Sequence, residues 1–413
     1  MDKKLRSLLW KWHFIGGIIS LPFVFLLAVT GTIYLFKDNY EKPVKEKISQ
    51  VNPKGSPLSF QKQWELVKSN WSKTPDAIVF NEDDHQATEF TSGRFSHKSS
   101  FYLNPYTGEE TGQFIPSQTD MHKVRKLHGE LLMGSFGTKI IELVASWMVV
   151  LILSGMYLFW PKEQGLKGLF HIRTNLGKRV FYRDLHGVLG FWFSGLLLLI
   201  LAGGFPWTDV FGSNYKWIQK ETNSGFPKTW SPHAFKSTPN GLSLTLDDFS
   251  QKAKELRLDG TVTIGLPRTP LGVFSISNQT TDFGKMSKYH FDRYSGELLS
   301  VSSWKDIGLM MKVRLWMMAF HQGKFGIWNF LIVLITALAL CFMSISASIS
   351  YLLKPKSNQF GVSYKSYQIN KTLLLLIIIL SVILPLFGFS LICIFTLKLL
   401  IKTIKNLYHN SLN

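Results

Sequence analysis

The sequence predicts a membrane protein, mainly α-helical: a four-helix transmembrane bundle from an internal duplication, a fifth C-terminal span and two α+β modules outside the membrane. Of the 413 residues, 46% are hydrophobic and only 18% are charged, and the apolar residues gather in long blocks. The order of apolar block, long polar segment and apolar block occurs twice along the chain. The formal net charge is +19, and because the basic residues flank apolar blocks, they indicate membrane anchoring rather than nucleic-acid binding.

Five apolar blocks are long enough to be transmembrane helices, which need roughly 20 residues to cross about 30 Å of hydrocarbon. The first is longer than the apolar core of a secretory signal peptide, so we expect it to remain as an anchor. The last contains Pro385, where we expect a kink because proline lacks a backbone N–H. The predicted spans are 14–36, 143–160, 188–208, 327–353 and 372–397.

Lysine and arginine in the short connections set the predicted orientation, because cytoplasmic loops carry an excess of both. The N-terminus and the connections after the second and fourth spans are strongly basic, so we expect these three to be cytoplasmic. The long segments then face outward. So does the C-terminal tail, which mildly violates the rule through Lys398, Lys402 and Lys405.

These assignments divide the chain into spans, outer modules and cytoplasmic segments. The N-terminus with the first span is 1–36, the outer modules are 37–136 and 211–326, and the loops are 161–186 and 354–371. The remaining spans are 137–160, 187–210, 327–353 and 372–402, and the tail is 403–413.

The two outer modules show the same order of elements. Each begins with an amphipathic helix pattern, and in the second module Thr245 and Asp248 are spaced as a capping box. Each continues with a strand, a tight turn and a second strand, and the turns fall at 104–109 and 292–297. One such turn is weak evidence for a module of this type, because the turn is common in β proteins. Two such turns at matching places between matching spans are much stronger evidence. The apolar helix positions are Phe60, Trp64, Val67 and Trp71, then Phe249, Ala253 and Leu256.

Four histidines fall at matching membrane edges. His13 and His186 stand at the cytoplasmic starts of the first and third spans, and His128 and His321 precede the second and fourth on the outer side. Histidine near hydrocarbon tends to face the bundle interior with a partner. Two imidazoles on facing helices can bind a haem iron from both faces. The sequence therefore predicts two non-covalent b-type haems, one between His13 and His186 and one between His128 and His321.

Four basic residues near these histidines are candidates to pair with haem propionates: Lys11, Arg125, Arg183 and Arg314. Neighbouring glycines would let the macrocycle approach the backbone. The cysteines Cys341 and Cys393 both lie in apolar blocks, and no CxxCH motif occurs, which excludes covalent c-type attachment.

The histidines also have a plainer interpretation, since a single interfacial histidine is more often hydrogen-bonded than metal-bound. The duplicated placement of both pairs favours haem.

Histidines 85, 97, 233 and 290 fall in the outer modules without ligand spacing, and we interpret them as surface or structural. His122, with Lys123 and Arg125, forms either a basic rim for an anion or a solvated helix face. Nearby rival axial ligands, or flexible core fillers, are Met310, Met311, Met317 and Met318.

Several segments together resemble the PepSY-associated transmembrane family, which includes iron-uptake-associated membrane proteins and ferric-siderophore reductases. They read WKWHFIGGI, AVTGTIYLF, SGMYLFWPK and RVFYRDLHGVLGFW, with the two Tyr-Thr/Ser-Gly-Glu hairpins, and cover about 8–355. The chain has Asn104 and Arg293 where the family often shows Asp and Pro. The resemblance implies the bacterial inner membrane, periplasmic PepSY modules and haem-mediated electron transfer to a ferric siderophore. It also leaves open a regulatory or peptidase-binding role.

The leading functional hypothesis is electron transfer across the membrane. Electrons enter from a quinol or a cytoplasmic reductase, pass the inner and outer haems, and leave to a ferric siderophore or similar chelate. The alternative is a membrane-anchored PepSY binding or regulatory protein without redox activity. No GxGxxG or P-loop occurs, so we expect no nucleotide site, and the spans lack the intramembrane charges typical of a transporter.

Overall fold

The computed structural model describes residues 3–93, 97–160, 165–354 and 369–410. The chain divides into two units. The bundle unit comprises Met1–Leu35, Val124–Ile218 and Trp316–Asn413, and the sheet unit comprises Phe36–Lys123 and Gln219–Leu315. The first predicted outer module therefore ends earlier than 136, at Lys123, whereas the second is shorter at both ends, since it runs from Gln219 to Leu315 rather than over 211–326. The segment with His128 and the one with His321 both belong to the bundle unit.

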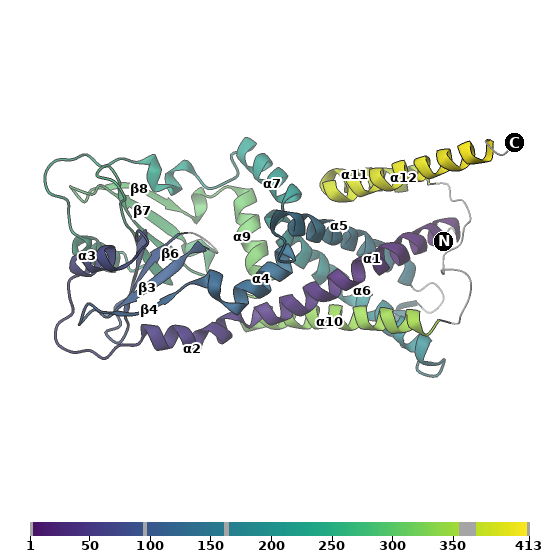
Figure 1. Ribbon diagram of the computed structural model, residues 1–413, viewed down its shortest axis with the longest axis horizontal. Coiled ribbons are helices and arrows are strands. Elements are labelled where there is room, and N and C mark those ends of the chain that lie inside the picture. The colour runs from purple at the N-terminus through teal and green to yellow at the C-terminus, as the bar shows by residue number, and fades with distance from the viewer. Residues whose placement is uncertain (1–2, 94–96, 161–164, 355–368, 411–413) are drawn as a thin grey trace. The chain divides into compact units, whose positions relative to one another are not determined.

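Four long apolar helices form the bundle, as predicted: α1 (Lys3–Leu35), α5 (Gly134–Phe159), α6 (Lys178–Gly204) and α10 (Ile327–Leu352). In Figure 1, α1 runs beside α5 and α10, and α6 packs on α5 and α10. Most apolar side chains of these helices stay outside the protein core, which suits a lipid surround. The buried centre comprises Val24, Val144, Met148, Ile152 and Leu197.

The predicted fifth span is divided into two helices, α11 (Lys371–Ile383) and α12 (Pro385–Asn410). They lie side by side in Figure 1, and a Cβ on Gly388 would meet Ser381 at 2.9 Å. In a continuous helix these two residues would be about 10 Å apart. The chain therefore turns back at Leu384 rather than kinking within one span. At 1.5 Å per residue, α11 is about 20 Å long and too short to cross, whereas α12 is long enough.

One carboxylate inside the bundle has a structural role. Glu142 on α5 is 1% exposed and accepts the backbone N–H groups of Val210 (2.8 Å) and Phe211 (2.9 Å). These open helix α7 (Val210–Glu221), whose first N–H groups lack partners within the helix. Glu142 therefore caps α7 from a neighbouring helix.

The sheet unit holds one eight-stranded antiparallel sheet, in the order β4-β3-β2-β1-β5-β6-β7-β8. The two predicted modules are thus not separate, because β1 pairs with β5 at the centre, with Ile78 opposite Ile264. The strands are β1 (Ala77–Phe80), β2 (Thr88–Ser92), β3 (Ser99–Leu103), β4 (Glu110–Phe114), β5 (Thr261–Gly265), β6 (Phe274–Gln279), β7 (Ser287–Phe291) and β8 (Leu298–Ser303).

Each half of the sheet contributes the predicted helix, α3 (Phe60–Asn70) and α8 (Leu246–Glu255). Their apolar faces pack with the inward strand residues in one core, which includes Trp64 and Phe249. The capping box of Thr245 and Asp248 is confirmed.

Both predicted turns are also confirmed. The Asn104 side chain accepts the N–H of Tyr106 (2.9 Å), as the Asp292 side chain accepts that of Tyr294 (2.7 Å). Asn104 and Asp292 therefore have the same role in the two turns, because either side chain supplies the accepting oxygen.

The remaining helices connect these elements. They are α2 (Lys37–Ser49), α4 (Asp120–Glu130) and α9 (Leu309–His321), with short 3-10 turns η2 (Pro116–Gln118), η3 (Gly165–Leu169), η4 (Phe205–Trp207), η5 (Lys228–Trp230), η6 (Pro232–Ala234), η7 (Phe283–Lys285) and η8 (Trp304–Asp306).

Candidate functional site

The structure brings the four histidines of the bundle together as the two predicted pairs. His13 of α1 faces His186 of α6, with ring centroids 6.2 Å apart and ring planes at 78°. His128 of α4 faces His321 of α9, with centroids 6.3 Å apart and planes at 70°. The two pairs thus have nearly the same separation and the same crossed arrangement.

The imidazoles of His13 and His128 are each held by a hydroxyl on a neighbouring span. His13 Nδ1 lies 3.1 Å from Ser154 Oγ, and His128 Nδ1 lies 3.0 Å from Thr30 Oγ1. Both hydroxyls already donate within their own helices, Ser154 to Val150 O and Thr30 to Leu26 O, each at 2.7 Å. They are therefore acceptors toward the histidines, and Nδ1 carries the proton in both rings.

The imidazoles of His186 and His321 are each held by a backbone carbonyl. His186 Nδ1 donates to Met343 O (3.0 Å), and His321 Nδ1 donates to Ile200 O (2.8 Å). A carbonyl can only accept, so Nδ1 is again protonated. In all four neutral rings the lone pair then belongs to Nε2, which is the nitrogen left for a metal.

Glycines on the neighbouring spans make room for three of the rings. A Cβ on Gly155 would lie 3.0 Å from His13 Cε1, one on Gly31 would lie 3.2 Å from His128 Cε1, and one on Gly203 would lie 2.8 Å from His321 Cβ. The hydroxyl and the glycine are adjacent in sequence, as Thr30-Gly31 and Ser154-Gly155. These glycines thus accommodate the imidazoles themselves.

The geometry of the pairs fits a metal held between two imidazoles. A metal-bound imidazole nitrogen lies about 2.0–2.1 Å from a first-row ion, and the ring centre about 1.2 Å further, which predicts centroids roughly 6–6.5 Å apart. The observed separations fall in this range. Two neutral rings that each offer Nε2 as an acceptor cannot hydrogen-bond to each other.

No group of three or more His, Cys, Asp or Glu side chains suited to a metal ion occurs among the described residues. The four nitrogens of a porphyrin would supply the other ligands of an ion held between either pair. The residues present fit that group.

The predicted propionate partners differ in their surroundings. Arg183 Nη2 lies 3.3 Å from Asp184, and Arg125 Nη1 lies 3.7 Å from Glu130. Lys11 is half-buried two residues before His13, and Arg314 is 7% exposed and belongs to the sheet unit. Their role toward haem remains a prediction.

The methionine-rich stretch before His321 has contacts of its own. Met310 Sδ accepts from Thr222 Oγ1 at 3.8 Å, and the backbone carbonyl of Met317 lies against Gly203. Since each histidine already has a histidine opposite, the pairs leave no axial position for a methionine.

Outside the pairs, the histidines follow the plainer interpretation. His85, His97 and His233 are exposed, whereas His290 is fully buried against Phe235, with ring centroids 5.0 Å apart. His122 is half-buried, and its backbone N–H donates to Thr119 Oγ1 at 3.2 Å.

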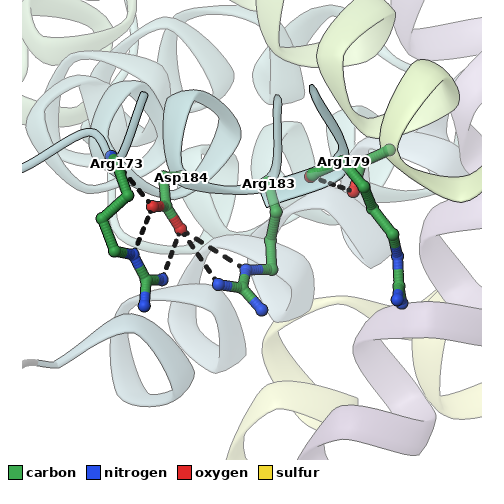
Figure 2. A network of polar contacts seen from close by, with 5 residues as sticks. Arg173, Arg179, Arg183 and Asp184 are labelled. Atoms are coloured by element: carbon green, nitrogen blue, oxygen red, sulfur yellow. Dashed lines mark hydrogen bonds and ion pairs between the residues drawn. The ribbon is translucent and has the colours of Figure 1, made fainter. Parts of the chain in front are cut away.

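Sequence reasoning missed Thr30, Ser154 and Asp184. The sequence contained a signal for Thr30 and Ser154. A hydroxyl residue followed by glycine occurs in α1, as Thr30-Gly31, and in α5, as Ser154-Gly155. Figure 2 shows Asp184 between Arg173 and Arg183, and Asp184 lies two residues before His186 in the sequence. Arg173 lies 11 residues upstream, so only the folded loop brings it there.

Together, the five long apolar helices among the described residues and the antiparallel sheet define a multi-pass membrane protein that also contains a folded β-sheet domain. The family model described as the PepSY-associated TM region matches residues 10–354, and the chain belongs to this family. No curated protein matches the chain.

Proposed function

We propose that this protein is a di-haem electron-transfer protein of the bacterial inner membrane that reduces a periplasmic ferric siderophore or similar ferric chelate. The observation that carries the proposal is the pair of crossed histidine couples, each with Nδ1 protonated and centroids 6.2 or 6.3 Å apart. A bound haem would supply a one-electron carrier at each couple.

The spacing of the couples along the spans supports a transmembrane path. On α1, His13 and the His128 partner Thr30 are 17 residues apart, which is about 26 Å of helix. On α6, His186 and the His321 partner Ile200 are 14 residues apart, or about 21 Å. The hydrocarbon layer is about 30 Å thick, so the couples lie toward opposite faces.

The protein's own residues would do the positioning. Ser154, Thr30 and the carbonyls of Met343 and Ile200 fix the four rings. Fixed rings lower the reorganisation that accompanies each electron transfer. The basic connections support an N-terminus in the cytoplasm, where a reductase, or a quinol from the bilayer, would act as donor.

A spectrum of the detergent-solubilised full-length protein tests the proposal. We expect a Soret band, reducible α-bands and two haems per chain, with His128→Ala and His321→Ala each losing one. With haem bound, two iron d orbitals would interact with the imidazole rings. Because the two ring planes of each couple are crossed, these orbitals would have almost equal energies. We therefore expect strongly anisotropic low-spin EPR signals. A colourless preparation from haem-replete cells would contradict the proposal.

A second candidate is a membrane-anchored binding protein without redox activity. The edge strand β8 favours it, because Leu298 and Val301 on this strand are 48% and 47% exposed. An exposed edge with apolar side chains can take up an extended peptide as a further strand. Under this candidate the purified protein is colourless, and a peptidase or envelope partner binds equally well when all four histidines of the pairs are replaced.

A further inference from the structure

The connection between α5 and α6 combines exposed apolar and basic side chains. Leu166, Phe170 and Leu176 are 77%, 64% and 57% exposed. Both flanking helices are spans, so this connection lies at the bilayer surface. Apolar side chains left exposed there reach the boundary between headgroups and acyl chains, as in interfacial segments.

The connection is fixed against α6. Trp192 Nε1 donates to the carbonyl of Leu169 (3.1 Å), and the ring of Phe170 packs against Trp192 with centroids 4.7 Å apart and ring planes at 36°. Arg173 is bound to Asp184 through Nε (2.7 Å), Nη2 (2.8 Å) and its backbone N–H (3.2 Å). The apolar residues and the arginines are therefore presented from one ordered surface.

The basic side chains of this surface outnumber their acidic partner. Asp184, 8% exposed at its side chain, is shared by Arg173 and Arg183. Figure 2 shows the side chains of these two arginines and of Arg179 extending the same way. Lys167, Lys178 and Arg179 are exposed as well. Within 165–184, the described part of this connection, one carboxylate thus accompanies five basic residues and contacts two of them.

We propose that residues 165–183 bind an anionic phospholipid, with the guanidinium and ammonium groups on its phosphate and the exposed apolar side chains against its acyl chains. A phosphate on a bilayer lipid is the anion that is always present at this level of the protein. The inference does not depend on haem. Each basic residue near an anionic surface strengthens binding about fivefold.

The test uses detergent-solubilised full-length protein and native mass spectrometry to count bound lipid. The protein is titrated with phosphatidylglycerol, with phosphatidylcholine that has the same acyl chains, and with inorganic phosphate. We expect the wild type to prefer phosphatidylglycerol. The double variant Lys167→Gln/Arg179→Gln, which spares Arg183 and hence the haem prediction, should bind it about 30-fold more weakly.

A matched control removes two exposed lysines from the sheet unit, Lys62→Gln/Lys236→Gln, and should leave lipid binding unchanged. Leu166→Asn should weaken lipid binding too. Equal affinity of the wild type for both lipids would overturn the inference, as would an unchanged affinity in the double variant. Displacement of the lipid by millimolar phosphate would show a site for a free anion and would also overturn it.

Discussion

Gln61 and Asp247 cap each other's helices. The Asp247 carboxylate at the start of α8 accepts the N–H groups of Phe60 (2.7 Å) and Gln61 (3.0 Å), and Gln61 Oε1 accepts the N–H of Leu246 (3.1 Å). The starts of α3 and α8 are thereby joined, although they are 185 residues apart in sequence. This contact reinforces the union of the two sheet halves.

Asp247→Ala removes two hydrogen bonds to helix α3 and should destabilise the sheet unit by about 1–2 kcal/mol. Chemical unfolding of the full-length protein, monitored by the near-UV circular dichroism of its aromatic side chains, measures the change. Glu65→Gln, an exposed change on α3, is the control and should have little effect. An Asp247→Ala midpoint equal to that of the wild type would show that the cap contributes nothing.

Ser154→Ala removes the acceptor for His13 Nδ1 and lets the imidazole rotate. Loss of such an outer partner typically weakens a metal site about 10- to 100-fold, so we expect weaker haem binding and a shifted midpoint potential at one couple. Spectroelectrochemical titration and haem retention during washing measure both.

The matched control for that variant is Ser146→Ala, a buried hydroxyl on the same helix that donates only to Glu142 O. It should keep wild-type haem affinity and potentials. Equal behaviour of the two variants would contradict the positioning role of Ser154. The comparison of these two variants requires bound haem. It is therefore made after the absorbance spectrum of the wild-type protein has shown haem.

Burial, with a smaller contribution from the nearby charge of Lys288, lowers the pKa of His290 from its ordinary 6.5 to about 4. In the unfolded chain the His290 imidazole takes up a proton near pH 6.5, whereas in the folded protein it does so only near pH 4. The stability contributed by the neutral ring is therefore full above pH 6.5 and falls as the pH drops toward 4, by about 3 kcal/mol in all.

His290→Phe should remove this part of the pH dependence while keeping the contact with Phe235. Unfolding free energies of the sheet unit at pH 7.5 and pH 5, compared between wild type and variant, measure it. The wild type should lose more stability between the two values. An identical loss in both would mean that other groups carry the acid sensitivity.

The α11–α12 turn predicts where the C-terminus lies. If the chain turns back at Leu384, Lys371 and Lys405 are on the same side of the membrane as the N-terminus, which removes the violation of the basic-loop rule. Lys371→Cys and Lys405→Cys, in a chain with Cys341 and Cys393 replaced by Ser, should react with an impermeant thiol reagent from the same side as Lys4→Cys. Labelling of Lys405→Cys from the opposite side would show a full fifth crossing.

The features predicted correctly were those with a local or repeated signal. The spans, the capping box of Thr245 and the turns at Asn104 and Asp292 each follow from residues close in sequence. The pairing of the four histidines followed from the duplication, since His13 and His186 hold matching places. Their action as haem ligands is still a prediction.

The features that were missed depend on contacts between distant residues. The β1–β5 pairing joins two segments with two spans between them, and no local pattern specifies it. Pro385 indicates a break in a helix, but the return of α12 along α11 depends on the close packing of Gly388 on Ser381. Likewise, the partner of a buried imidazole is chosen by how the helices pack.

The central pairing of β1 with β5 also constrains how the protein is made. When β1 leaves the ribosome, its partner is still about 180 residues away, and at 5–20 residues per second the wait is roughly 10–40 s. During that interval the first four strands have an open edge at the place that will become the middle of the sheet. Biogenesis must therefore shield a half-finished sheet until two more membrane insertions are complete.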